Sequence, residues 1–256
     1  MRPRALWIAC LALLLAAGAL SERSWLSVRS CIPEIGPKQI EPTIGQGVLL
    51  GILGGFRTVI ADMTWIRSYV LWERKDRPAC ETLMRTACAL DPHSRYFWEN
   101  TGYALGYDMA HWEIRRRGGY AKVPKEIQDH LFKSYARKGL EVLDEGVRLS
   151  KGRAALLVFA GQLAEMKLSD KQLAADYYRQ AAETVSPPWY AARFCARNEW
   201  DAGHPMEAYV WFKNYWLDRL SKESDHAPDD LALIRDMETH LKINLLSRIP
   251  RQSWEK

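Results

Sequence analysis

The chain has 256 residues, of which 48% are hydrophobic and 26% are charged, with 16 Gly and 12 Pro. This composition excludes collagen, low-complexity disorder and a small disulfide scaffold, and a mean hydropathy of −0.30 excludes a protein made mostly of membrane spans. The formal net charge of +5 is too small to indicate nucleic-acid binding by itself.

The first 20 residues are typical of an export signal. Residues 1–4 (Met-Arg-Pro-Arg) are basic, and residues 5–20 are apolar without interruption. A helix of that length spans about 24 Å, less than the roughly 30 Å of a bilayer core. We therefore expect residues 1–20 to be either a signal peptide, cleaved near the small residues 17–19, or a short uncleaved membrane anchor.

Residues 21–46 are expected to be a linker, because Pro and Gly interrupt the segment repeatedly and no apolar periodicity runs through it. The pattern then predicts a helical repeat domain over 47–247 and a C-terminal tail over 248–256. At the start of the domain, residues 47–56 are apolar and rich in Gly. Such a segment is typical of a buried first helix, and also of a patch that dips into a membrane surface.

The cysteines do not form a metal or redox motif. Cys31, Cys80, Cys88 and Cys195 show no CxxC and no Cys/His ligand spacing. If 76–90 is one helix, Cys80 and Cys88 are about 12 Å apart along it and cannot form a disulfide with each other. An oxidising compartment would permit a disulfide from Cys31 to one of them, whereas the three later cysteines are expected to be small buried residues at helix contacts.

Helical periodicity dominates from residue 57 onward. Apolar and aromatic residues recur at steps of three and four, as in Trp65, Tyr69 and Trp72. Alternating segments rich in Val, Ile and Thr are almost absent, which argues against strands. The chain is therefore predicted to be all-α, with at least seven antiparallel helices between residues 57 and 247 and no sheet.

Small residues recur at two sets of positions with matching spacing. In the first set the spacings are 34, 59 and 35 residues, and in the second, one helix later, they are 59, 35 and 34. The first set is Ser68, Gly102, Gly161 and Ala196, and the second is Ala87, Gly146, Ala181 and Tyr215. Small residues let paired helices approach closely, so the two sets predict one helical hairpin repeated four times.

These spacings resemble the tetratricopeptide repeat (TPR), a helix–turn–helix unit of about 34 residues. The resemblance covers about 61–220 and departs from the family's pattern at Tyr215, where Ala is usual. It implies a right-handed superhelix (α-solenoid) of about four TPR-like helical hairpins, with residues 228–247 as a C-terminal capping helix. The second hairpin carries about 25 extra residues, an insertion over about 107–132 that we expect to lie as a loop between its two helices.

A shorter resemblance lies at residues 53–57, 61–62 and 65–67 (Leu-Gly-Gly-Phe-Arg, Ala-Asp and Trp-Ile-Arg). These residues are similar to the opening of a group of bacterial envelope proteins in which one N-terminal membrane segment precedes such repeats. The resemblance implies a location at the periplasmic face of the inner membrane or in the periplasm, and it implies no activity.

No pattern of side chains indicates an enzyme. The chain contains no dinucleotide fingerprint, no Walker sequence and no HExxH motif. We therefore predict no catalytic residue, no metal site and no cofactor. The alternative is an envelope enzyme that acts on wall polymer through carboxylates such as Glu99 and Glu165, if two of them come within acid/base distance.

The TPR resemblance implies that the first helix of each hairpin lines a concave groove for a protein or peptide partner. An extended or helical peptide would be held there by apolar anchors and oriented by charge. The residues at these positions that we expect to bind the partner are Tyr69, Tyr96, Glu99, Tyr103, Tyr107, Gln162, Glu165, Tyr190, Arg193, Arg197 and Trp200. Trp65 and Trp72 share the face but are expected to belong to the core, whereas Tyr103, Arg193 and Arg197 are expected to be exposed.

The insertion is a second candidate site because five basic residues follow one another without an acidic residue between 114 and 125. They are Arg115, Arg116, Arg117, Lys122 and Lys125. Membrane phosphates or an acidic partner could pair with them, and a solvated loop is equally expected. Export argues against nucleic acid.

Taken together, these patterns predict an exported, membrane-tethered TPR scaffold that mediates protein–protein interactions in the bacterial cell envelope. The alternatives are the envelope enzyme described above and a membrane-surface-binding protein that uses residues 47–57 and the basic insertion. The sequence leaves open the identity of the partner and the oligomeric state.

Overall fold

The computed structural model describes residues 55–220 and 227–252, which form helices and connecting turns without a strand. The segments 1–20 and 21–46 and Cys31 lie outside these ranges. The α-helices are α3 (Arg57–Glu73), α4 (Arg77–Leu90), α5 (Arg95–Tyr103), α6 (Met109–Arg116), α7 (Lys125–Leu149), α8 (Arg153–Leu163), α9 (Lys171–Ala182), α10 (Ala191–Asp201), α11 (Pro205–Tyr215) and α13 (Ala227–His240). There are also π-helical segments, η2 (Ala104–Asp108), η3 (Ala164–Leu168) and η4 (Trp216–Leu220), and a 3-10 turn, η5 (Leu245–Ser247). The predicted all-α class is confirmed for the described residues.

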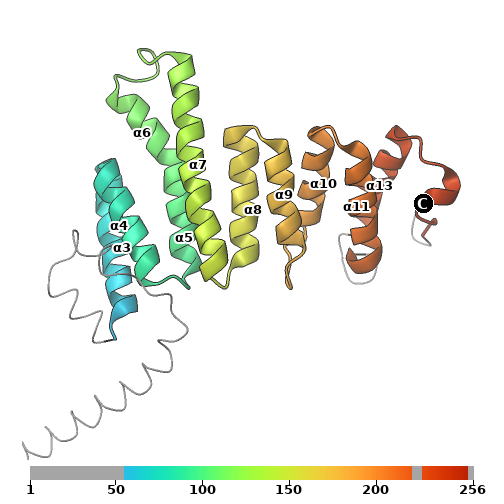
Figure 1. The fold of residues 1–256 in the computed structure, drawn as a ribbon, viewed down its shortest axis with the longest axis horizontal. Helices are drawn as coiled ribbons and strands as arrows, with labels where there is room; N and C mark the ends of the chain where they lie inside the picture. The colour runs from blue at the N-terminus through green and yellow to red at the C-terminus, as the bar shows by residue number, and fades with distance from the viewer. Residues whose placement is uncertain (1–54, 221–226, 253–256) are drawn as a thin grey trace, which may run out of the picture. The chain divides into compact units, whose positions relative to one another are not determined.

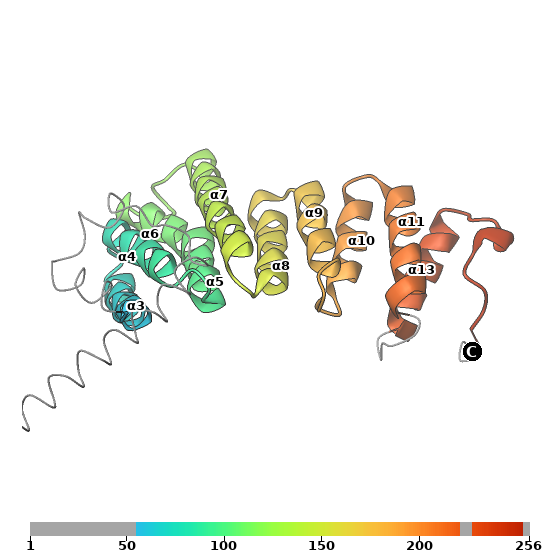
Figure 2. The same cartoon turned by 60° about the horizontal axis from the view of Figure 1, so that its bottom comes forward.

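The chain forms two compact units, Met1–Met63 and Thr64–Lys256. Within the second unit, helices that follow one another in the chain pack against one another, and these contacts run from α7 through α8, α9, α10 and α11 to α13. From α7 to α11 the consecutive helices run in opposite directions (Figure 1, Figure 2). The short connections therefore produce antiparallel neighbours, as the periodicity predicts.

Polar side chains determine where two of these helices begin. The Asp170 carboxylate accepts a hydrogen bond of 2.9 Å from the backbone N–H of Leu173 at the start of α9. Asp76 accepts from Ala79 at the start of α4, whose first turn also contains Pro78. Each capping oxygen satisfies a backbone donor that the first helical turn leaves without a partner.

The small residues of the two spaced sets lie where paired helices come close together. Gly161 of α8 faces Tyr178 of α9, and a Cβ added to Gly161 would lie 2.8 Å from the ring. Gly102 of α5 faces Leu143 of α7, and there the corresponding distance is 2.7 Å. Cβ atoms do not approach other heavy atoms that closely, so both helix pairs require Gly at their present separation.

The extra residues of the second hairpin do not form the loop that we expected over 107–132. They lengthen both helices instead, because the first continues from α5 through η2 and α6 to Arg116, and the second, α7, already begins at Lys125. The physical reason is that α6 packs against α7 and buries apolar side chains such as Ile114. Only residues 117–124 connect the two helices.

The last helix ends at His240 and not at 247 as expected. Lys242 has a φ of 52°, the left-handed conformation that closes many helices. The N–H of Ile243 then donates to the carbonyl of Glu238 at 3.0 Å, which satisfies one of the last helical carbonyls. The first turn of α13 is acidic, with Asp229 and Asp230, which favours the positive end of the helix dipole.

The three cysteines in the described ranges are buried free thiols. Cys80, Cys88 and Cys195 lie on α4 and α10 at helix contacts, as the sequence predicts. Burial raises the pKa of each thiol to about 12, so all three are protonated at neutral pH.

Candidate functional site

Side chains join successive first helices of the hairpins along one surface, which we call the first-helix face. The Trp72 indole N–H of α3 donates to Asp108 of η2 at 3.0 Å, and the Asn198 amide of α10 donates to Glu165 of η3 at 3.3 Å. The face is defined by Trp72, Tyr103, Tyr107, Asp108, Phe159, Glu165 and Asn198.

Three aromatic rings from two successive first helices form a stack at the centre of this face. Tyr103 and Tyr107 come from α5 and η2, and Phe159 comes from α8; the ring centroids are 4.9 to 6.1 Å apart and the planes lie within 23° of one another. The side chain of Tyr103 is 49% exposed. We call these three residues the aromatic cluster. It offers apolar surface to solvent with a polar hydroxyl at its edge.

A cation and a cavity lie beside the aromatic cluster. The Lys167 ammonium is 4.7 Å from the ring centroid of Tyr107 and 5.3 Å from that of Phe132. The same lysine borders a cavity of about 410 Å³, whose lining residues are Asp129, Phe132, Lys133, Met166, Lys167 and Ser169. An apolar surface, a hollow and a positive charge are therefore adjacent on this part of the face.

The Glu165 carboxylate is engaged on both oxygens. Lys171 donates to Oε1 at 2.9 Å, and Tyr178 and Asn198 donate to Oε2 at 3.2 and 3.3 Å. Partial burial alone would raise the pKa of Glu165, but the hydrogen bonds and the charge of Lys171 outweigh it and hold the pKa below its usual value. The side chain is therefore an ionised, oriented acceptor at neutral pH.

The polar groups near η2 influence one another's ionisation. Partial burial raises the pKa of Asp108, and the hydrogen bond from Trp72 and the electrostatic interactions with His111 and Lys167 oppose this rise. Partial burial and the Lys167 charge lower the pKa of His111. The imidazole of His111, beside the first-helix face, is therefore neutral at neutral pH.

Arg193 is not the exposed groove residue that we expected. Its side chain is only 16% exposed, and its guanidinium contacts the buried carboxylate of Asp230 on α13 through Nε at 2.8 Å and Nη2 at 2.6 Å. Arg193 therefore joins α10 to the last helix. The correction arises because the two partners are 37 residues apart in the sequence, beyond the reach of any local pattern.

Arg197 and Trp200 of α10 remain candidates for binding. Arg197 is exposed, and both side chains line a cavity of about 260 Å³ against Met237 and His240 of α13. The Trp200 ring lies edge-on to the imidazole of His240, with centroids 6.2 Å apart. This cavity is a second hollow on the side of the first helices.

The other expected groove residues are not gathered into one site. Two of them are exposed and three are half-buried: first Tyr69 and Tyr96, then Glu99, Gln162 and Tyr190. Glu99 pairs with Arg95 of its own helix at 3.4 Å. Tyr96 lies edge-on to Trp65, with centroids 5.6 Å apart.

Two π-helical turns shape the first-helix face. η2 and η3 occupy similar places in successive first helices, since each directly follows the α-helical part. Their wider turns contain Tyr107, Asp108 and Glu165. Such turns are rare and are frequently found at functional sites.

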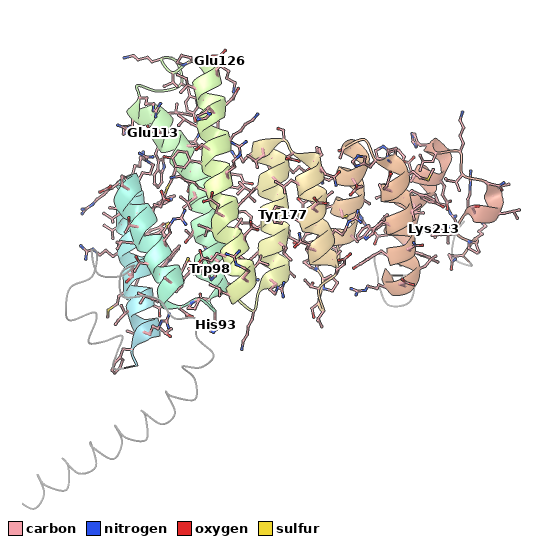
Figure 3. The ribbon with its side chains drawn as sticks, in the orientation of Figure 1. His93, Trp98, Glu113, Glu126, Tyr177 and Lys213 are labelled. Atoms are coloured by element: carbon pink, nitrogen blue, oxygen red, sulfur yellow. The ribbon has the colours of Figure 1, made fainter. Side chains whose placement is uncertain are left out.

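Most of the basic residues that the sequence analysis placed in the insertion form ion pairs with carboxylates. Glu113 of α6 is buried and accepts hydrogen bonds from Arg116 and Arg117 at 2.6 to 3.0 Å, while Arg77 lies 3.3 Å away (Figure 3). Lys125 pairs with Asp129 at 2.6 Å. Arg115 and Lys122 are exposed.

Glu113→Gln is expected to lower the free energy of unfolding by about 2 kcal/mol at neutral pH, because charged hydrogen bonds to a buried acceptor are lost. The hydrogen bond from Arg116 is the largest cause that lowers the pKa of Glu113 from 4.5 to about 2 in the folded protein. The carboxylate therefore stabilises the fold above pH 4.5, and this stabilisation is lost as the pH falls toward 2.

Urea denaturation of both proteins, at neutral pH and at a pH between the two pKa values, measures this effect. Glu126→Gln is the matched control, because Glu126 is exposed at the start of α7 (Figure 3). A difference between wild type and Glu113→Gln that does not shrink on acidification would contradict this role of the carboxylate.

The described residues 55–220 and 227–252 contain no group of three His, Cys, Asp or Glu side chains arranged for a metal ion. Over the same part of the chain, no helix has the length and apolarity needed to cross a membrane. No protein-family model matches the chain, and a comparison with curated proteins finds no match. The assignment of the first-helix face as the candidate site therefore rests on its geometry alone.

Three residues of the first-helix face were not predicted from the sequence: Asp108, Phe159 and Asn198. Phe159 was not among the expected groove positions, yet its ring on α8 stacks with those of Tyr103 and Tyr107. Asn198 is 2% exposed, but its sequence neighbours Arg197 and Glu199 are charged, so no local pattern indicated its burial.

Proposed function

We propose that this protein is an exported, membrane-tethered TPR-like scaffold of the bacterial cell envelope, and that it binds a protein or peptide partner along the first-helix face. The location rests on the basic start and the apolar run of residues 1–20. The superhelical arrangement rests on the matching spacings of the small residues, together with Gly102 and Gly161 at close helix contacts.

The observation that carries the proposal is the aromatic cluster. Two successive first helices together present Tyr103, Tyr107 and Phe159 as one stacked surface, and Tyr103 remains 49% exposed. Exposed aromatic residues clustered beside a hollow are typical anchors for a partner's apolar side chains. The neighbouring Lys167 supplies charge that would orient the partner.

The chemistry of the face favours binding over catalysis. Glu165, one of the two carboxylates considered for an envelope enzyme, is held ionised by three donors. The other, Glu99, lies on a different helix from Glu165 and pairs with Arg95 of its own helix. A general acid requires a raised pKa, and the pKa of Glu165 is lowered.

A membrane-surface function is the second candidate, because Arg115 and Lys122 are exposed near the end of the long hairpin. Three of the five basic residues there pair with carboxylates, namely Arg116, Arg117 and Lys125. Their charge is partly neutralised, which weakens the attraction to lipid phosphates.

Tyr103→Ala is expected to reduce capture of a crosslinked partner from the native envelope by about tenfold, because an anchoring aromatic contributes more than about 1 kcal/mol. Arg197→Glu is expected to reduce capture mainly at low salt, since an exposed charge acts through association rate. The readout is the yield of the same captured protein with the full-length chain.

The control for this experiment is the double variant Arg115→Ala, Lys122→Ala, which removes the two exposed cations of the long hairpin and should leave capture unchanged. Circular dichroism checks that all variants are folded. Loss of capture in the double variant, together with normal capture by Tyr103→Ala, would place the site on the hairpin and overturn the proposal.

A further inference from the structure

An apolar stripe runs along the exposed side of α3. Phe56, directly before the helix, and Val59, Met63, Ile66 and Val70 within it are between 41% and 65% exposed. The opposite side of the same helix carries Ala61 and Ser68, both fully buried. We call these five exposed residues the α3 stripe; four of them lie on α3 and Phe56 directly precedes it.

The spacing of the α3 stripe is that of a helix-pairing seam. Its members follow one another at steps of three and four residues, which are the a and d positions of a heptad with Phe56, Met63 and Val70 at a. A helix that is apolar on two opposite sides is normally covered on both. The stripe therefore lacks a covering element among the described residues.

The charges beside the stripe complement one another across two copies of the helix. In this register Asp62 takes a g position and Arg67 takes the following e position, five residues later, and both are exposed. In a parallel pair of helices, a g residue of one strand meets the next e residue of the other. Asp62 of each copy would therefore meet Arg67 of the other.

We propose that α3 docks on α3 of a second copy of this chain, as a short parallel two-stranded contact. A lipid surface fits the flank less well, because the exposed Asp62 borders the stripe and would be repelled by anionic headgroups. The chain's own apolar residues 47–54 carry no charge that could pair with Asp62 and Arg67. A parallel orientation also suits chains that enter from the same membrane.

The contact is small, so the dimer is concentration-dependent. From Phe56 to Val70 the stripe is about 21 Å long at 1.5 Å per residue. A pair of such short helix faces buries less surface area than a standard protein–protein interface. Two chains tethered to one membrane have a raised effective concentration, and this favours a contact that is weak in solution.

Cysteine crosslinking of the full-length chain in its membrane tests the proposal. Val70→Cys, in a background with Cys10→Ser and Cys31→Ser, places two thiols face to face in a parallel pair and far apart in an antiparallel one. We expect a disulfide-linked species of twice the 29.4 kDa chain mass. Thr58→Cys is the control, because Thr58 is exposed at a c position, away from the seam where the two helices would meet.

Charge reversal tests the pairing itself. Asp62→Arg alone and Arg67→Asp alone each create like charges across both sides of the dimer, and each is expected to lower the apparent association constant about tenfold. A mixture of the two single variants restores both pairs in the mixed dimer. Crosslinking of Val70→Cys in this mixture is expected to return to the unreversed level.

Two results would overturn the proposal. The first is crosslinking of Val70→Cys no stronger than that of Thr58→Cys. In that case, labelling of Ile66→Cys with a maleimide identifies the true occupant: protection that needs vesicles indicates lipid, and protection in the isolated chain indicates its own N-terminal residues. The second is crosslinking that both charge reversals leave unchanged, because it would exclude the parallel register.

Discussion

Gly161→Leu is expected to lower the free energy of unfolding by about 3 kcal/mol, because the added side chain must displace a packed ring. A Cβ at this position would already lie 2.8 Å from Tyr178, whose ring is fully buried between α8 and α9. The ring cannot rotate away without losing its hydrogen bond to Glu165. Displacement of the ring and its rotation away from Gly161 would both loosen the contact between the two helices of one hairpin.

Urea denaturation followed by circular dichroism measures this loss. Gln162→Leu is the matched control, since it adds the same side chain at the next, half-buried position of α8. Arg117→Ala does not serve as a neutral control, although a solvated loop is one of the expectations from the sequence there, because Arg117 donates to the buried Glu113. Equal midpoints for Gly161→Leu and Gln162→Leu would contradict the close helix contact.

Arg193→Glu is expected to be the second large loss, of about 3 kcal/mol or more, because it leaves the buried carboxylate of Asp230 against a second negative charge. Arg197→Glu, four residues later and exposed, is expected to change the free energy of unfolding by less than about 0.5 kcal/mol. Both variants replace Arg with Glu, so they differ only in the burial of the arginine side chain that is replaced.

The same denaturation experiment separates these variants, and a charge swap extends it. Arg193→Glu combined with Asp230→Arg should recover part of the stability, since the pair is restored in reverse. If Arg193→Glu unfolds at the same urea concentration as wild type, Arg193 is not a structural link to α13.

The fold was predictable because its signals are local or periodic. The three- and four-residue periodicity predicts helices, and the two spaced sets of small residues predict the close contacts at Gly102 and Gly161. The expected loop over 107–132 was wrong because the packing of α6 on α7, which keeps that segment helical, is a tertiary contact. No propensity along the chain reports such a contact.

The candidate site was predictable only in part. Tyr103 and Tyr107 lie together as the repeat positions suggest, because residues four apart share one face of a helix. Arg193 was misassigned because its charge is neutralised by Asp230 on another helix. The π-helical turns η2 and η3 have no sequence signature, and they direct Asp108 and Glu165 onto the face.

Photocrosslinking from the first-helix face tests the central proposal most directly. One variant of the full-length chain would carry p-benzoylphenylalanine in place of Tyr103 in the native envelope. A second variant of the same chain would carry it in place of Glu141, which is exposed on α7. Partner binding along the first helices predicts a defined crosslinked product from position 103 and none from position 141. A product from position 141 with none from position 103 would contradict it.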